Sequence, residues 1–298
     1  MLLEQKIISE IVELIYSAGN VAKDFFYRNN LNSSKKSDNT LFCDADLAVE
    51  DFIIKALALI TPSLPIISEE QAYQQQNLQK KITTNIGEYW LLDPIDGSNS
   101  FINHCNEFAI SLALISNGKP IFGILHAPLF NNGEIIYSNN DKIYQIDNLN
   151  SQSWSGLFNK QKLITSNNQG NKANQETDSL RIVASKRARK AEITDFFSNC
   201  SADLATNYSR YRNKIKHELE IIKISSAIKF IRLANNEADI FLQNQQTMPW
   251  DTGAGQAIIE KLDKKIYLIE SSLESYKIIN SSLCYLDPLK ANQKFLAF

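Results

Sequence analysis

The chain has 298 residues, of which 44% are hydrophobic and 21% are charged, and its formal net charge at pH 7 is -2. This composition is typical of a globular protein with a substantial core, and the nearly balanced charge excludes a global attraction to nucleic-acid polymers or anionic membranes. Early glutamates, Glu4 and Glu10, argue against a signal peptide, and no apolar run is long enough to span a bilayer. We therefore expect a cytoplasmic protein without an integral membrane segment.

The cysteines and histidines lack the spacing of a transition-metal site. Four cysteines lie far apart in the sequence: Cys43, Cys105, Cys200 and Cys284. They predict free thiols in a reducing compartment, with neither a zinc cage nor a disulfide framework. Three histidines are equally scattered: His104, His126 and His217. We expect them to be ordinary polar or half-buried side chains.

Two helices are predicted at the start of the chain. Apolar residues from Ile7 to Ile15 recur at helical spacing, and Gly19 marks a point at which this helix could bend. A polar loop is expected over 29–39. A second helix is expected from about Asp44 until Pro62. Its predicted apolar face carries Val49, Phe52, Ile53, Ala56, Leu57 and Ile60.

An antiparallel sheet is predicted next. Short strands are expected at 66–67 and 89–92, separated by a glutamine-rich polar segment over 71–81. Four apolar runs then follow, at 108–115, 121–126, 134–137 and 142–146. They are separated by turn dipeptides that favour hairpins: Asn117-Gly118, Asn132-Gly133 and Asn139-Asn140. Helices followed by such a meander predict an α+β first half.

The rest of the chain predicts a smaller α/β half. Residues 148–178 are rich in Asn, Gln and Ser, which suits a boundary or a flexible excursion. Strands and helices then alternate: a strand over 181–185, a helix from about 186, a strand over 221–224, a helix over 226–235, a strand over 238–242 and a helix after Trp250. We expect two domains, residues 1–165 and 166–298.

The most informative motif is Trp90-Leu91-Leu92-Asp93-Pro94-Ile95-Asp96-Gly97-Ser98. Two carboxylates, Asp93 and Asp96, flank a tight turn and would repel each other unless a cation shared them, which favours a hard-metal site. Gly97 and Ser98 open a predicted helix, whose N-terminal amides suit phosphate. Asp-Pro and Asp-Gly are also common turn dipeptides, so the motif alone could be a plain loop.

Two further acidic positions support the metal interpretation. Glu69 and Glu70 follow a short apolar run, and we expect Glu69 to reach a site while Glu70 points outward. The alternative is a solvated acidic loop. Asp251 follows Trp250 and could cap the helix that continues through Gln256, with or without its carboxylate in a cleft.

In this order the motifs resemble the inositol monophosphatase superfamily of Mg²⁺-dependent, lithium-sensitive phosphatases, and within it the CysQ-type 3'(2'),5'-bisphosphate nucleotidases. Supporting segments are Lys36-Ser37-Asp38-Asn39, Asp44-Ala45-Asp46, Asn106-Glu107-Phe108, Gly118-Lys119-Pro120 and the run from Ile224 to Phe230. The resemblance covers nearly the whole chain. It implies the layered α/β/α/β/α sandwich of the inositol monophosphatase and fructose-1,6-bisphosphatase type.

The resemblance also implies a ligand set for two to three Mg²⁺ ions. Glu69, Asp93 and the backbone carbonyl of Ile95 would hold the first ion. Asp93, Asp96 and Asp251 would hold the second, and Glu69 would also bear on a third, weaker site.

By the same resemblance, the catalytic residues would be Asp46, Glu69 and Ser98. The Ser98 hydroxyl, linked to Asp46, would position the attacking water and help to deprotonate it. The amides of Gly97 and Ser98 would receive the phosphate. The family usually has threonine at Ser98, where the hydroxyl survives, and at Cys43, where a local hydrogen bond is lost at most.

The substrate side is less defined. Lys229, Ser225 and Lys186 are the expected substrate-binding residues, with Lys229 or Lys186 near a second phosphate. Lys229 could instead be a solvated lysine on a helix, and Lys186 a solvated helix start. Asn99-Ser100 stand where related nucleotidases carry a charged pair, and Ser225 and Ala227 also depart from the usual pattern.

The predicted activity is Mg²⁺-dependent hydrolysis of adenosine 3',5'-bisphosphate, or of its sulfated relative, to AMP or its analogue and phosphate, with a role in sulfur metabolism. Inositol monophosphatase and sugar-bisphosphate phosphatase are alternatives with the same chemistry. A catalytically weak sensor of a phosphorylated ligand is an alternative of another class. The expected partner is a small phosphorylated substrate, with a nucleotide bisphosphate favoured, and the protein is expected to be a monomer or a homodimer.

Overall fold

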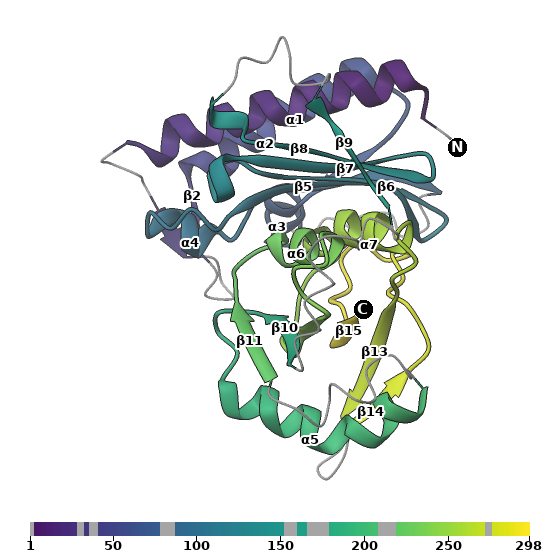
Figure 1. Ribbon diagram of the computed structural model, residues 1–298. Coiled ribbons are helices and arrows are strands. Elements are labelled where there is room, and N and C mark those ends of the chain that lie inside the picture. The colour runs from purple at the N-terminus through teal and green to yellow at the C-terminus, as the bar shows by residue number, and fades with distance from the viewer. Residues whose placement is uncertain are drawn as a thin grey trace.

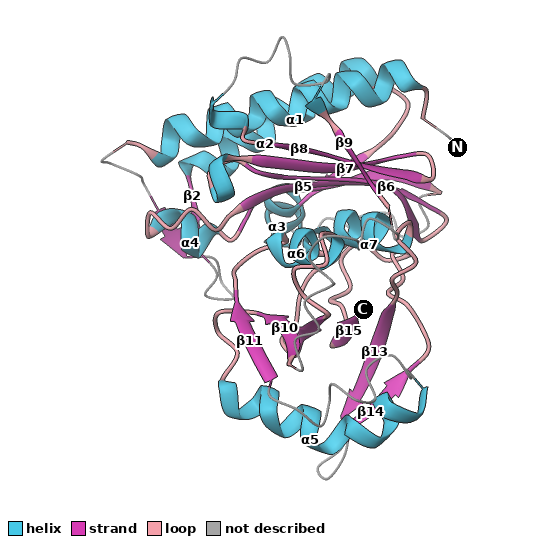
Figure 2. Ribbon diagram, viewed as in Figure 1, coloured by secondary structure: helices cyan, strands magenta, loops and turns pink. Residues whose placement is uncertain are grey.

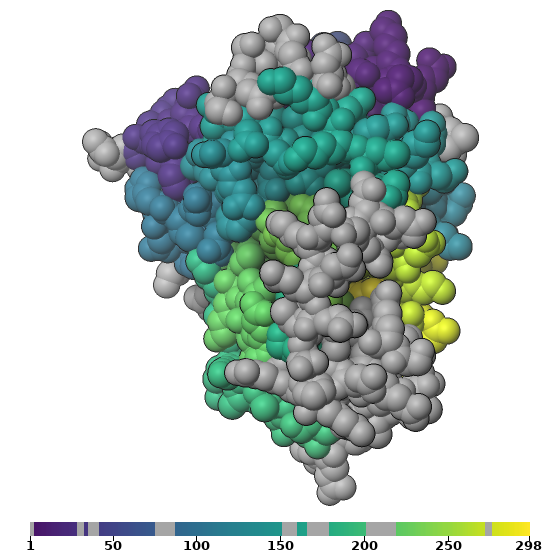
Figure 3. Space-filling view, in the orientation of Figure 1, coloured from purple at the N-terminus to yellow at the C-terminus, as the bar shows by residue number. Residues whose placement is uncertain are grey.

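The computed structural model describes residues 3–28, 33–35, 41–77, 87–151, 160–165, 179–207, 219–271 and 276–298. Its elements form five layers, in the order helices, sheet, helices, sheet, helix (Figure 1). The predicted α/β/α/β/α sandwich is therefore confirmed. In the space-filling view, the N-terminal half lies above the C-terminal half (Figure 3). Within the described ranges, no helix is both long and apolar enough to cross a membrane.

The first layer consists of α1 (Gln5–Phe26) and α2 (Asp44–Ile60), which cover one face of the first sheet (Figure 2). The predicted apolar stripe of α1 is buried except for Ile7, which is half-buried; of the predicted face of α2, Val49, Ile53 and Leu57 are buried, and Ala56 and Ile60 are half-buried. Phe52 was expected on the buried face of α2 but is 38% exposed, because it lies at the edge of the helix stripe rather than at its centre. Within the predicted polar loop, β1 (Ser33–Lys35) pairs with β2 (Leu41–Cys43), and the rest of the loop lies outside the described residues.

The first sheet has seven strands in the order β3-β4-β5-β6-β7-β8-β9. They are β3 (Ile66–Ser68), β4 (Glu88–Asp96), β5 (Ala109–Ser116), β6 (Lys119–Ala127), β7 (Glu134–Asn139), β8 (Lys142–Asp147) and β9 (Lys162–Ile164). Strands β4 to β9 pair antiparallel, which confirms the predicted meander, whereas β3 and β4 are parallel. Asn117, Asn132 and Asn140 adopt positive φ angles at the predicted turns.

The structure adds detail to two polar segments of this half, and one of them differs from the prediction. The glutamine-rich segment contributes to α3 (Glu69–Asn77), and its remainder lies outside the described residues. The segment over 148–178 was expected to be a boundary or a flexible excursion; within it, β9 pairs with β8 and so belongs to the first sheet, inside the predicted first domain of residues 1–165. Short 3-10 helices lie at Phe130–Asn132 and Leu149–Ser151. The residues over 152–159 and 166–178 are outside the described ranges.

The second sheet has six strands in the order β11-β10-β12-β15-β13-β14. They are β10 (Leu180–Ala184), β11 (Leu219–Lys223), β12 (Ile240–Gln243), β13 (Ile266–Ser271), β14 (Tyr276–Ile279) and β15 (Phe295–Ala297). Strands β10, β11 and β12 are parallel, as the predicted alternation requires. The last three strands were not predicted. The outer helix, α5 (Lys190–Asn207), begins later than expected, because Ser185 to Arg189 form a turn first.

The middle layer contains α6 (Ile228–Ala234) and α7 (Gly253–Glu260), which lie between the two sheets (Figure 1). One hydrophobic core joins residues of the first sheet, such as Leu91, to Phe230 of α6 and Phe295 of the second sheet. Helix α7 approaches β6 so closely that a Cβ on Gly123 would lie 2.3 Å from the Ala254 carbonyl oxygen. The division at residues 165 and 166 stays a prediction, since helices of the second half pack on the first sheet.

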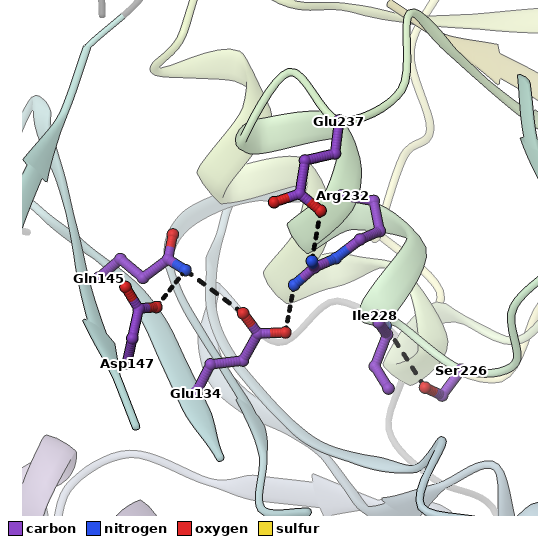
Figure 4. A network of polar contacts seen from close by, with 7 residues as sticks. All are labelled: Glu134, Gln145, Asp147, Ser226, Ile228, Arg232 and Glu237. Carbon is purple, nitrogen blue, oxygen red and sulfur yellow. Dashed lines mark hydrogen bonds and ion pairs between the residues drawn. The ribbon is translucent and has the colours of Figure 1, made fainter. Parts of the chain in front are cut away.

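A buried polar network also ties α6 to the first sheet (Figure 4). Arg232 of α6 pairs with Glu134 of β7 and with Glu237. The Gln145 amide donates to Glu134 at 3.3 Å and to Asp147 at 2.6 Å. Burial raises the pKa of Glu134 to about 7, against the opposing effect of Arg232. Because a buried ion pair is costly to break from one side, this network holds α6 at a fixed place on the sheet.

Gly19 of α1 packs against His126 of β6, and this contact gives a testable prediction. A Cβ at Gly19 would lie 2.0 Å from His126 Cε1. That ring is buried, and its Nδ1 is 2.9 Å from the Ile15 carbonyl oxygen. We expect Gly19→Ala to lower the free energy of unfolding by about 1–3 kcal/mol through overpacking, measured by urea denaturation. Gly87→Ala is the matched control, because a Cβ there meets nothing within 4 Å; equal losses in both variants would contradict the packing argument.

Candidate active site

Three carboxylates meet where β3 and β4 end. These strands are parallel, with Ser68 opposite Leu92, so Glu69 at the start of α3 and Asp93 near the end of β4 lie at the same sheet edge. Asp251 comes from the second half of the chain. One carboxylate oxygen from each of Glu69, Asp93 and Asp251 lies within 4.8 Å of the others. The structure thus brings together residues that are distant in sequence.

Asp251 is positioned by the short 3-10 helix Pro249–Asp251. Its Oδ2 accepts a hydrogen bond from the Met248 amide at 2.8 Å, so it caps this helix rather than α7, whose N-cap residue is Thr252. The Ser111 hydroxyl of β5 donates to the Trp250 carbonyl at 3.0 Å and fixes the segment against the first sheet. Asp251 therefore has both a capping role and a place in the cluster.

Asp96 lies beside the cluster but faces the second half. The register between β4 and β5 shifts between Asp93 and Asp96, which re-aims the end of the strand. Asp96 Oδ2 accepts a hydrogen bond from the Ala227 amide. Burial raises the pKa of Asp96 to about 6, with Lys229 opposing the shift. The Ile95 amide donates to Asp93 Oδ1 at 3.1 Å, so the backbone also helps to orient Asp93.

The electrostatics of the cluster suit a hard cation. Burial raises the pKa of Asp93 well above its usual value, and the neighbouring carboxylates, Glu69 first among them, raise it further. The pKa of Asp251 is raised in the same way, by burial and then by Asp96 and Glu69. All ligand atoms of the group are carboxylate oxygens, the donors that Mg²⁺ and Ca²⁺ prefer, and no described histidine or cysteine joins them. The residues present therefore fit a divalent cation of this type.

Asp46 and Ser98 lie next to the cluster in contact with each other. The Ser98 hydroxyl is 3.1 Å from Asp46 Oδ1 and 3.1 Å from the Ile95 carbonyl oxygen. Asp46 is buried at the start of α2, where its Oδ2 accepts the Cys43 amide at 2.8 Å and the Cys43 thiol at 3.1 Å. Burial raises the pKa of Asp46 to about 6. Cysteine in place of the family's usual threonine was expected to cost at most one local hydrogen bond. The Cys43 thiol instead makes its own hydrogen bond to Asp46.

Gly97 allows the two halves to approach each other at the site. It has a φ of 96° and precedes α4 (Ser98–Ile102). A Cβ there would lie 3.1 Å from the Glu107 carbonyl oxygen and 3.3 Å from Ser226 Cβ. Both the left-handed backbone and the close contact therefore require glycine.

A pocket of about 530 Å³ contains these residues. Its lining includes the acidic residues Glu69, Asp93, Asp96 and Asp251, the segment Gly97–Ser98, Ser225 and the cationic side chains of Lys186, Arg187 and Lys229. The pocket therefore combines carboxylates with three cationic side chains, drawn from both halves of the chain. With a cation bound to the carboxylates, such a pocket suits an anionic ligand.

The predicted substrate residues occupy different environments. Lys229 is 7% exposed, which excludes the solvated alternative; its amine donates to the Ser226 carbonyl at 2.6 Å. Burial lowers the pKa of Lys229, while Asp96 and Asp251 oppose the shift. Lys186 lies in the turn before α5, not at the helix start, and pairs with Glu107 at 2.9 Å. The Ser100 hydroxyl donates to Ser225 Oγ at 2.9 Å.

Two glutamates without a predicted role, Glu50 and Glu107, support the residues that line the site. Glu50 of α2 accepts hydrogen bonds from the amides of Glu70 and Gln71, at 3.2 and 3.3 Å, and so fixes the start of α3 that carries Glu69. Glu107 contacts Lys186 and the Ser225 amide. Glu70, expected to point outward, is only 2% exposed. Helical spacing alone gave no signal for Glu50, because a single acidic residue on a helix usually faces solvent.

The remaining predictions about reactive groups are mixed. All four cysteines lie in the described part of the chain and are free. His126 is fully buried rather than half-buried, and burial lowers its pKa to about 3. His104 is exposed, and His217 lies outside the described residues. None of the described histidines belongs to the carboxylate group.

The five-layer fold and a pocket that holds both a carboxylate cluster and cationic side chains are those of a phosphatase with the donor set for metal ions. The chain belongs to the inositol monophosphatase family, whose sequence model matches residues 3–283.

Relatives within this family are similar over most of the chain. The 3'(2'),5'-bisphosphate nucleotidase CysQ of Buchnera aphidicola is 33% identical over 256 residues, which cover 86% of this chain and 82% of that protein. The Escherichia coli K12 protein of the same name is 25% identical over 252 residues, covering 84% and 86%.

Solved structures show the same fold. CysQ from Bacteroides thetaiotaomicron matches with a TM-score of 0.66 at 20% identity, covering 98% of this chain and 97% of that one. The Thermotoga maritima IMPase matches with a TM-score of 0.60 at 18% identity, covering 99% and 92%.

Proposed function

We propose that the chain is a Mg²⁺-dependent 3'(2'),5'-bisphosphate nucleotidase that converts adenosine 3',5'-bisphosphate to AMP and phosphate. The observation that carries this proposal is the carboxylate group of Glu69, Asp93 and Asp251 in a pocket that cationic side chains also line. Similarity to CysQ of Buchnera aphidicola over 86% of the chain favours the nucleotide substrate. We expect the active protein to be a monomer or a homodimer.

In this proposal, Glu69, Asp93, Asp96, Asp251 and the carbonyl oxygen of Ile95 would hold two to three Mg²⁺ ions. When bound, these ions supply the positive charge that a phosphate monoester needs to react at a useful rate. The Lys229 amine donates to the Ser226 carbonyl and so helps to hold the Ser225–Ala227 turn beside these residues.

Ser98 and Asp46 would act on the attacking water. The Ser98 hydroxyl donates to Asp46, so its oxygen lone pairs remain available to orient a water molecule. Because burial raises the pKa of Asp46 to about 6, this carboxylate is a stronger base than an exposed aspartate. The amides of Gly97 and Ser98, at the start of α4, would receive the phosphate oxygens.

One observation favours the inositol monophosphatase alternative, whose substrate has a single phosphate; it does not favour a sugar-bisphosphate phosphatase. The buried amine of Lys229 is engaged by the Ser226 carbonyl and faces Asp96 and Asp251, so it offers little charge to a second phosphate. The alternative of a catalytically weak sensor is less supported, because the predicted carboxylate ligands are all retained.

Phosphate release separates these functions. We expect Mg²⁺-dependent release from adenosine 3',5'-bisphosphate that exceeds release from inositol 1-phosphate and fructose 1,6-bisphosphate. A chelator should abolish the activity, and millimolar lithium should inhibit it. Preference for inositol 1-phosphate would replace the substrate assignment, and ligand binding without turnover would support a sensor.

A further inference from the structure

Glu107 joins three segments of the chain at the edge of the pocket. It lies in the loop between α4 and β5, and its side chain is only 16% exposed. One carboxylate oxygen is 2.9 Å from the Lys186 amine, and the other accepts the Ser225 amide at 2.9 Å. The carboxylate thus belongs to the first half of the chain, while both of its partners belong to the second half. Glu107 is not a member of the metal-type carboxylate group.

The turn that Glu107 contacts is strained and held at both ends. Ser226 has a φ of 61°, a left-handed conformation that is unfavourable for a residue other than glycine. Glu107 holds the Ser225 amide before it, and Asp96 holds the Ala227 amide after it. The same turn meets Gly97, the residue that precedes α4, through Ser226 Cβ. The position of the Ser225–Ala227 turn relative to the carboxylate cluster therefore depends on Glu107.

Glu107 also fixes the amine of Lys186. The Lys186 side chain is 43% exposed, and an exposed lysine loses considerable rotamer entropy when a ligand orders it. Glu107 orders the amine beforehand, and the Cys105 sulfur contacts it at 3.3 Å. Lys229 is buried, whereas Lys186 and the neighbouring Arg187 are exposed pocket cations, so these two are placed to meet a second anionic group of a substrate.

We propose that Glu107 is a positioning residue that selects substrates carrying a second phosphate. It does so by holding Lys186 and the Ser225–Ala227 turn in place at the pocket that contains the carboxylate cluster. This inference rests on the proposed phosphatase function and extends it to substrate class. Glu107 itself would not touch the reacting phosphate; its effect passes through Lys186.

The variant Glu107→Gln separates the two contacts. Glutamine retains an oxygen for the Ser225 amide but loses the charge that attracts Lys186. We expect KM for adenosine 3',5'-bisphosphate to rise by about fivefold to tenfold, with kcat within about twofold of the wild type. KM for adenosine 3'-monophosphate should stay within about twofold, because this substrate lacks the second phosphate. A merely structural role would change both substrates alike.

Two further variants complete the test. Lys186→Met should give the same selective rise in KM, and the double variant Glu107→Gln/Lys186→Met should be no worse than either single variant, because both act on one contact. Glu192→Gln is the matched control: Glu192 pairs with Arg189 at 2.5 Å on the same segment but does not line the pocket. It should leave both KM values unchanged.

The outcomes distinguish this inference from the function on which it rests. Wild-type protein that turns over inositol phosphates but not the nucleotide would overturn the nucleotidase assignment alone, and the Glu107 comparison would then use inositol 1-phosphate and inositol 1,4-bisphosphate. An unchanged ratio of bisphosphate to monophosphate KM in Glu107→Gln, or additive effects in the double variant, would overturn the role of Glu107.

Discussion

Asp93→Asn is expected to lower turnover by about three orders of magnitude while the protein still folds. Asp93 belongs to the carboxylate group with Glu69 and Asp251 and is 1% exposed. Asparagine has nearly the same shape but cannot supply the negative charge that a shared divalent cation requires. Phosphate release at saturating Mg²⁺ measures the effect, and circular dichroism checks the fold.

Without metal, the same substitution is expected to preserve or raise the stability of the folded protein. Burial and the neighbouring carboxylates raise the pKa of Asp93 in the folded protein, so ionising it at neutral pH opposes folding. A group whose folded pKa is raised contributes stability at low pH that is lost as the pH rises. In a chelator at pH 7, the Tm of Asp93→Asn should therefore equal or exceed that of the wild type. Adding Mg²⁺ should raise the Tm of the wild type more than it raises the Tm of Asp93→Asn.

Asp51→Asn is the matched control, because Asp51 is exposed and pairs with Lys55 on the outer face of α2. It should change neither turnover nor the response of Tm to Mg²⁺. Wild-type turnover in Asp93→Asn, or an equal gain in Tm from Mg²⁺ in both proteins, would show that Asp93 does not hold a metal ion.

Elements with a strong hydrophobic period could be predicted from the sequence. The apolar spacing of α1 and the alternation of runs and Asn-containing turns in β5 to β8 are local signals, and both elements formed as expected. Helix α3 has no such signal, because its glutamine-rich sequence has a low apolar content, and its start is set by Glu50 from another helix. Phe52 shows a second limit of prediction from the sequence: helical spacing indicates which face of a helix is buried, but not where the buried face ends.

The candidate site depended on both local and tertiary information. The spacing of Asp93 and Asp96 is local, so the motif indicated carboxylates near one turn. Their meeting with Asp251 depends on the 3-10 helix that Ser111 holds against β5, which no local pattern shows and which only the resemblance implied. Burial of Lys229 and the contacts of Glu107 likewise depend on packing between the two halves. Such contacts have no signature in residue type or spacing.

Ser98→Ala is expected to lower kcat by about 100-fold, since one positioned proton-transfer group contributes about 10²–10⁴ in rate. The hydroxyl connects Asp46 to the position next to the carboxylate group, and alanine removes this connection without adding bulk. KM for the substrate should change little, because the phosphate would still meet the amides of Gly97 and Ser98. Steady-state kinetics at saturating Mg²⁺ measure both parameters.

Ser98→Thr provides the control that identifies the hydroxyl as the cause. Threonine keeps the oxygen, and its added methyl group lies on a half-buried side chain at the start of α4, so activity should stay within about threefold of the wild type. If alanine retained full kcat, the link between Ser98 and Asp46 would have no part in catalysis. If threonine were as inactive as alanine, the loss would come from packing around α4 rather than from the missing hydroxyl, and Asp46 would have to act on the water without Ser98.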